Sequence, residues 1–126
     1  MSADARSRLT ELALTLRHDV GKYVTRAARN LPPEDPPPVL LDMLVADLFR
    51  TDGTHTALAV YEARVSASQV SEADVPPGIR VALEALMALE PRVRAHHADA
   101  VSEACRLALV VDDACRAFVR AQEADA

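Results

Sequence analysis

Aromatic residues and glycine are scarce in this sequence. Its 126 residues include no Trp, two Tyr, two Phe and three Gly, whereas 50% of the residues are hydrophobic. Much of that apolar content is alanine and leucine, which favour helices, while strands are enriched in aromatic and β-branched residues. A chain of this length fits one domain with a core of its own. The composition therefore predicts an all-α fold in which residues 1–126 form a single domain.

Long uninterrupted hydrophobic runs are also missing. Acidic residues such as Asp42 and Asp47 break the longest apolar stretches well short of the ~18 to 20 residues of a membrane span. Segment 1–6 carries acidic and polar groups and lacks the apolar core of a secretory signal, so we expect no membrane span and a cytoplasmic location. The two cysteines, Cys105 and Cys115, are expected on one helix at a separation of about 15 Å, which excludes a disulfide between them.

An excess of positive charge, which nucleic-acid binding would require, is absent. The net charge is -5, so we expect no nucleic-acid partner. The charges are unevenly spread, however, because residues 1–30 hold six basic side chains against three acidic ones. The first helix is therefore predicted to form a basic strip on an acidic body.

Apolar residues recur at helical spacing along most of the chain. The pattern predicts a helix over 3–30, which the proline-rich connector 32–38 must end. Further helices are expected to start at Pro38, at a cap supplied by Thr54 or Thr56, and at Ile79. The helix from Pro38 is apolar nearly all round, so we expect it at the centre of the bundle. Pro91 either kinks a long helix or starts a new one, and we predict a new start because an interior proline costs ~3 kcal/mol. The last helix is expected to run to about residue 122, and its predicted inward residues are Val93, His97, Ala100, Ala104, Ala108, Val111, Cys115 and Phe118. These helices together give a bundle of four or five helices.

His18 is the most informative side chain of the first helix. At ~100° per residue it points away from the apolar stripe, so we expect it to be exposed together with Lys22, Thr25 and Arg29. Gly21 lies one turn from His18, and a mid-helix glycine costs about 1 kcal/mol relative to alanine. Such a glycine indicates that another surface approaches there, although a solvated polar face with a tolerated glycine would give the same pattern. His18, Gly21, Lys22, Thr25 and Arg29 thus form the predicted partner-binding face.

The segment from His18 to Lys22, which reads HDVGK, resembles the HD-x-G-K segment of the HD metal-dependent phosphohydrolases. The resemblance implies that His18 and Asp19 ligate a metal ion that activates water. That family also uses an upstream histidine, and no histidine precedes residue 18 here. His96, His97 and Asp99 could complete a site from another helix, but their order in the chain departs from the family pattern.

The segment Leu16-Arg17-His18-Asp19 is similar to the helices of histidine phosphotransfer proteins, in which an acid follows the histidine that accepts the phosphoryl group. The resemblance implies that His18 is the acceptor, that Lys22 steadies the phosphoryl charge and that Gly21 admits an acidic receiver domain. No Gly-rich ATP-binding segment follows, so such a chain would relay phosphoryl groups without taking them from ATP.

The remaining polar clusters favour no conventional enzyme. His96, Asp99 and Glu103 share one face of the last helix and are expected to be solvated, since a metal needs three or four convergent ligands. Asp112 and Asp113 are expected to form surface ion pairs with Arg116. No nucleophile motif or phosphate loop is present, so we expect neither a cofactor nor a metal site.

The sequence therefore predicts a small signalling or regulatory module that binds another protein through the basic face around His18. The expected partner carries an acidic surface, such as a receiver domain, and homo-oligomer formation stays open. The first alternative is histidine phosphotransfer through His18, and the second is a degenerate HD-type phosphohydrolase.

Overall fold

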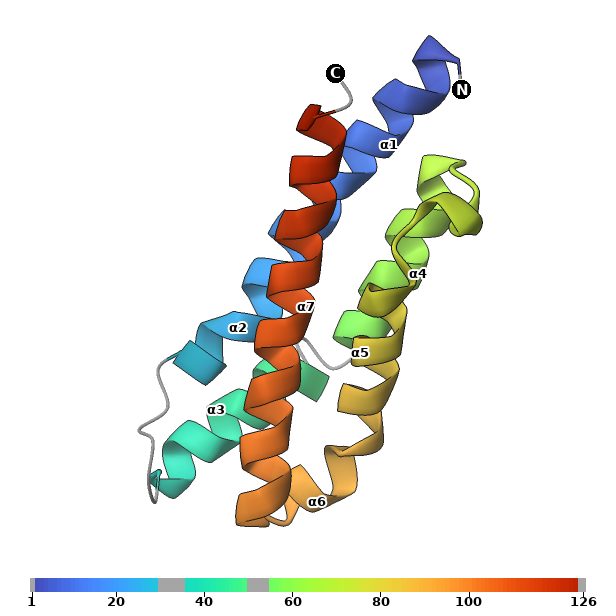
Figure 1. Ribbon diagram of the computed structural model, residues 1–126. Coiled ribbons are helices and arrows are strands. Elements are labelled where there is room, and N and C mark those ends of the chain that lie inside the picture. The colour runs from blue at the N-terminus through green and yellow to red at the C-terminus, as the bar shows by residue number, and fades with distance from the viewer. Residues whose placement is uncertain (1, 30–35, 50–54, 125–126) are drawn as a thin grey trace.

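The computed structural model describes residues 2–29, 36–49 and 55–124, and every regular element in these ranges is helical, which confirms the all-α bundle. The first of the predicted helices comprises α1 (Ala3–Leu16), a π-helical turn η1 (Arg17–Gly21) and α2 (Lys22–Arg29) in direct succession. The other elements follow along the chain (Figure 1): α3 (Pro38–Phe49), α4 (Ala57–Ser68), a 3-10 turn η2 (Glu72–Asp74), α5 (Pro77–Ala88), α6 (Glu90–Arg94) and α7 (Ala98–Ala124). Within the described ranges, none of the helices combines the length and the apolar character that a membrane span requires.

Local capping chemistry accounts for several helix starts. The Thr56 hydroxyl accepts a hydrogen bond from the Ala59 amide and begins α4, as one of the two expected caps. Pro38 opens α3, where its fixed φ suits the first helical turn. The Ser71 hydroxyl accepts from the Ala73 amide and begins the short turn η2 in the connection before α5. The predicted cap Thr54 and most of the proline-rich connector lie outside the described residues.

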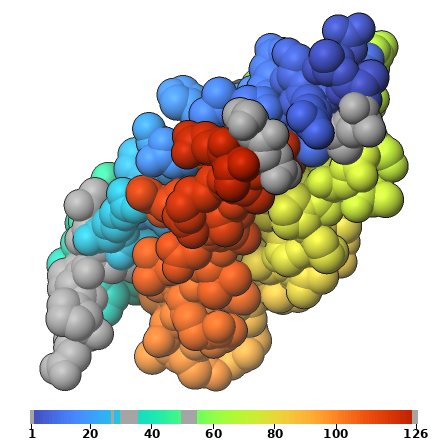
Figure 2. Space-filling model, turned by 45° about the horizontal axis from the view of Figure 1, so that its top comes forward, coloured from blue at the N-terminus to red at the C-terminus, as the bar shows by residue number. Residues whose placement is uncertain are grey.

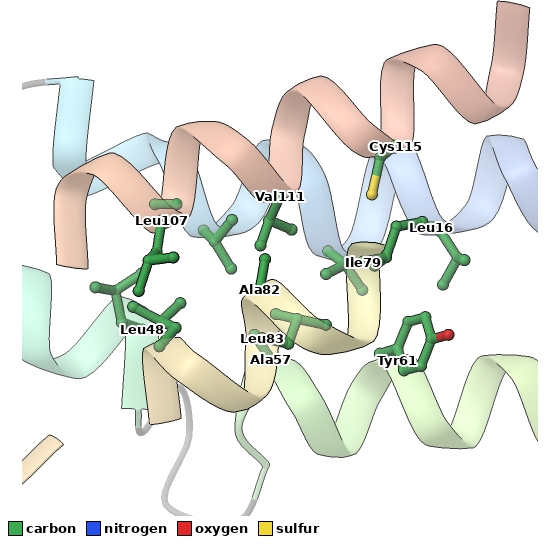
Figure 3. Packing of buried hydrophobic residues seen from close by; sticks show 14 of the residues in the cluster. Leu16, Leu48, Ala57, Tyr61, Ile79, Ala82, Leu83, Leu107, Val111 and Cys115 are labelled. Carbon is green, nitrogen blue, oxygen red and sulfur yellow. The ribbon is translucent and has the colours of Figure 1, made fainter. Parts of the chain in front are cut away.

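The 27-residue helix α7 is the axis of the bundle. It packs against α1, the π turn and α2 on one side and against α5 on another, as the ribbon shows (Figure 1). Leu107, Val111 and Cys115 point from α7 toward α5, where Ile79, Ala82 and Leu83 meet them (Figure 3). These contacts belong to one continuous cluster of buried hydrophobic side chains, so the described helices share a single core.

Helix α3 is less central than its apolar sequence predicts. Leu44, Leu48 and Phe49 are fully buried, but Val39 and Met43 are 64% and 53% exposed. The helix therefore packs through one side, and its opposite side carries apolar groups at the surface.

Pro91 begins a new helix as predicted, but that helix ends after one turn. The Ala95–His97 region closes α6 with two backbone hydrogen bonds, from the His96 amide to the Val93 carbonyl and from the His97 amide to the Arg92 carbonyl. This is a Schellman motif, and His96 takes the left-handed conformation at φ 59 that glycine usually fills. The chain turns before α7, so His97, which was expected to point inward, is exposed.

Candidate functional site

The π turn η1 determines which side chains of the first helix reach the surface. Its Lys22 amide donates to the Arg17 carbonyl, five residues earlier, so the turn accommodates one residue more than an α-helical turn. From the last residue of the turn onward, the side chains are consequently rotated by about one helical position, ~100°, relative to an uninterrupted α-helix. Gly21 and Thr25 are thereby turned toward α7.

Gly21 and Thr25 were expected on the exposed face, and that expectation is wrong. Both are buried, and the Thr25 hydroxyl donates to the Gly21 and Lys22 carbonyls at 3.2 Å each. The surface that approaches Gly21 is α7 of the same chain. A Cβ on Gly21 would lie 3.1 Å from Asp112 Oδ1 and 3.2 Å from Cys115 Cβ. The glycine therefore permits close packing of two helices within the bundle.

His18 is exposed, as predicted, with 77% of its side chain accessible. Its Nδ1 lies 2.9 Å from Asp19 Oδ1. An ionised carboxylate can only accept hydrogen bonds, so in the neutral ring Nδ1 carries the proton and Nε2 carries the lone pair. The neighbouring aspartate thus selects the tautomer that presents a nucleophilic nitrogen at Nε2.

Asp19 is itself held by a residue from another helix. Arg64 of α4 donates from Nε to Asp19 Oδ2 at 3.0 Å. The pKa of Asp19 is lowered, first by the His18 hydrogen bond and then by Arg64, against an opposing effect of partial burial. Arg64, Asp19 and His18 therefore form a hydrogen-bonded chain, which we term the His18 triad, with a carboxylate that stays ionised.

The two basic residues of the predicted face differ in their surroundings. Lys22 is exposed one turn after His18, and no ion pair engages it in the part of the chain that the structure describes. Arg29 is half exposed, but its Nη2 donates to Asp112 Oδ2 at 2.9 Å. Arg29 consequently joins α2 to α7 and is only in part available to a partner.

Asp112 was expected on the surface and is buried instead, with 2% of the residue accessible. Its Oδ2 also accepts a hydrogen bond from Arg116, at 3.1 Å, so two half-exposed arginines balance one buried carboxylate. Its Oδ1 has no hydrogen-bond partner among the described atoms and faces Gly21. Through its ion pair with Arg29, Asp112 thus joins α7 to α2, which directly follows the π turn that carries His18.

The polar cluster at the start of α7 forms pairs of its own. Asp99 pairs with Arg92, Glu103 pairs with Arg106, and His96 Nε2 lies 3.4 Å from Asp42 Oδ1. Among the described residues, no group of three His, Cys, Asp or Glu side chains could hold a metal ion. These residues are therefore occupied by exposed ion pairs, which contribute little to stability.

Three comparisons, with protein-family models, with curated protein sequences and with solved structures, found no match for this chain. The chemistry of the His18 triad is therefore the basis for a function. Of the predicted site residues, His18 and Lys22 are exposed. Gly21 and Thr25 are buried, and Arg29 forms an ion pair with Asp112. Arg64, which the sequence did not indicate, contacts Asp19 from a position 45 residues away.

Proposed function

We propose that this chain is a phosphoryl-carrying signalling module in which His18 Nε2 accepts and returns a phosphoryl group. One observation carries the proposal, namely that an exposed imidazole donates from Nδ1 to an ionised carboxylate and so presents Nε2 outward. A side chain with this tautomer and exposure is suited to attack an electrophile carried by another protein. Binding to a partner, which the sequence also predicts, is then the first step of the exchange.

The transfer step needs a nucleophile on this chain, a leaving group on the partner and a group that stabilises the charge on the imidazole ring. The Nε2 lone pair attacks the phosphorus of an aspartyl phosphate on the partner, and the bond from phosphorus to the carboxyl oxygen breaks with its electrons retained by the partner's carboxylate. The imidazole ring becomes positively charged because Nδ1 keeps its proton. Asp19 accepts the hydrogen bond from that proton and stabilises the ring charge, while Arg64 holds Asp19 in place.

Lys22 is suited to stabilise the negative charge of the phosphoryl group. Lys22 is exposed one turn after His18, so its ammonium group adds positive charge to the surface near that histidine. The same charge favours an acidic partner, such as a receiver domain. The burial of Gly21 and Thr25 leaves a smaller contact face than the sequence predicts, which favours transfer chemistry at one histidine over a broad docking surface.

No observation favours the hydrolase alternative. Asp19 uses both carboxylate oxygens for His18 and Arg64, so the adjacent histidine and aspartate bind each other. A third convergent ligand is missing among the described residues, in keeping with the ion pairs formed around His96 and Asp99.

A direct test uses phosphoramidate, a small donor that phosphorylates histidine without a partner protein and releases ammonia. We expect the wild-type chain to gain one acid-labile, alkali-stable phosphoryl group and the His18→Gln variant to gain none. The His97→Gln variant, which changes another exposed histidine, should behave as wild type. Equal labelling of the wild-type and His18→Gln chains, or no labelling of either, would contradict the proposal.

A further inference from the structure

A hollow lies beside the His18 triad, between α1 and α4. It has a volume of about 280 Å³ and reaches to Thr15, three residues before His18. The two helices meet on the face shown in Figure 2, where α1 is blue and the end of α4 with η2 is yellow-green. The cavity, which we term the α1–α4 site, is lined by Arg8, Glu11, Leu12, Thr15, Arg64, Ala67, Ser68 and Gln69.

Several polar groups of the α1–α4 site lack an ion pair or use only part of their hydrogen-bonding capacity. Over the described ranges, no ion pair engages Arg8 or Glu11. Arg64 donates from Nε to Asp19, and no hydrogen bond is found for its terminal nitrogens in the part of the chain described. Ser68 differs, because its hydroxyl donates to the Val65 carbonyl and accepts from the Val70 amide. The cavity therefore offers two guanidinium groups and one carboxylate to a ligand.

The charges in this lining define a class of ligand. A guanidinium group binds a carboxylate through paired hydrogen bonds, which Arg8 and Arg64 can both supply. Glu11 disfavours a second negative charge on the ligand and accepts hydrogen bonds from an ammonium group. Leu12 and Ala67 supply the apolar part of the lining, against which a short carbon chain can pack. The volume lies just below the usual range for small-molecule sites, so the ligand is small.

We propose that the α1–α4 site binds a small zwitterion with one carboxylate and one ammonium group, the class to which free amino acids belong. The carboxylate binds to Arg8 and Arg64, and the ammonium group lies toward Glu11. Binding at this site does not require phosphoryl transfer at His18, although Arg64 belongs to both sites. A ligand carboxylate on its terminal nitrogens contacts the same guanidinium group that holds Asp19, so a coupling to His18, which rests on the proposed function, follows.

The test is a titration of the ¹⁵N-labelled chain with a panel of free amino acids, followed by amide and arginine Nε signals in NMR spectra. At least one amino acid should shift the signals of Leu12, Thr15 and Arg64 and bind about tenfold more tightly than acetate or methylamine, a difference of ~1.4 kcal/mol. Arg8→Ala and Arg64→Lys should each weaken that binding about tenfold. Glu11→Gln should reduce the preference over acetate, and Arg120→Ala, which changes an exposed arginine of α7, should leave binding unchanged.

Two results would contradict the proposal that the α1–α4 site binds a zwitterion. One is the absence of shifts at these residues with every probe, and the other is binding that Arg8→Ala and Arg64→Lys leave as tight as in wild type. Circular dichroism of each variant separates loss of binding from loss of fold. Phosphoramidate labelling is measured in parallel. Amino-acid binding without labelling at His18 supports the α1–α4 site and refutes the proposed function. Labelling at His18 without amino-acid binding supports the proposed function and refutes the α1–α4 site.

Discussion

Replacing Gly21 with alanine tests how closely α7 packs against the π turn. The new Cβ would lie 3.1 Å from Asp112 Oδ1, 3.2 Å from Cys115 Cβ and 3.5 Å from Asp112 Cα. None of these atoms can move away readily. The Cys115 Cβ is one bond from the backbone of α7, and Arg29 and Arg116 hold the Asp112 carboxylate at 2.9 and 3.1 Å. The two helices must therefore separate slightly to accept the methyl group.

Two effects of opposite sign determine the size of the change. Alanine is favoured over glycine in a helix by about 1 kcal/mol, whereas overpacking a tight interior contact costs ~1 to 3 kcal/mol. We expect Gly21→Ala to lower the free energy of unfolding by about 1 kcal/mol, which corresponds to roughly 4 °C in the melting temperature.

Gly78→Ala is the matched control, because a Cβ at Gly78 in the first turn of α5 would meet no atom within 4 Å. This variant should raise the free energy of unfolding by up to ~1 kcal/mol. Both values come from urea denaturation followed by circular dichroism. If Gly21→Ala stabilised the chain as much as Gly78→Ala, the close approach of α7 would not explain the glycine.

Three further predictions concern individual side chains. His96→Gly should raise stability by up to ~1 kcal/mol, because His96 has φ 59 and its contact with Asp42 is exposed; a lower melting temperature would contradict this. The folded state lowers the pKa of Asp19 from 3.8, chiefly through the His18 hydrogen bond, so its stabilisation is present above that value and is lost as the pH falls through the folded pKa. Asp19→Asn should therefore be less stable than wild type near neutral pH, by under ~1 kcal/mol for a carboxylate that is 30% exposed, and a gap that persisted in acid would refute the assignment. Burial raises the pKa of Cys115 to about 12, so a maleimide should modify Cys105 first and reach Cys115 only on unfolding; equal rates in the folded chain would contradict its burial.

Much of the fold could be predicted from local signals in the sequence. Pro38, Thr56 and Pro91 each begin a helix, because their effects on φ or on the first amides are intrinsic to the residue. The inward residues of the last helix were also predicted with the exception of His97, since a 3.6-residue period needs no tertiary information. The break before α7 was missed because a histidine takes the left-handed position that glycine would have indicated.

The candidate site was harder to predict because it depends on a change of helical period. His18 lies at the start of the π turn, before the added residue changes the helical period, so regular α-helical geometry predicts its exposure. Gly21 and Thr25 follow the added residue, and a constant ~100° per residue placed them on the wrong face. Arg64 reaches Asp19 across 45 residues, and no local pattern indicates such a contact.

The burial of Asp112 also depends on a contact between residues that are far apart in the sequence. Its ion pair with Arg29 joins residues 83 positions apart, and the sequence shows only two adjacent aspartates near Arg116. A carboxylate in that pattern is usually solvated. Burial becomes tolerable because the two arginines converge on one oxygen, which only the packing of α2 on α7 brings about.

In the proposed function, Asp19 directs the reactive lone pair of His18 to Nε2. Phosphorus NMR of the chain after reaction with phosphoramidate tests this claim directly, because phosphohistidine substituted at Nε2 is distinguished from the isomer substituted at Nδ1. We predict a single phosphohistidine signal from the Nε2 isomer, lost in His18→Gln and slower to appear in Asp19→Asn. A signal from the Nδ1 isomer, or an Asp19→Asn variant that reacts as fast as wild type, would contradict it.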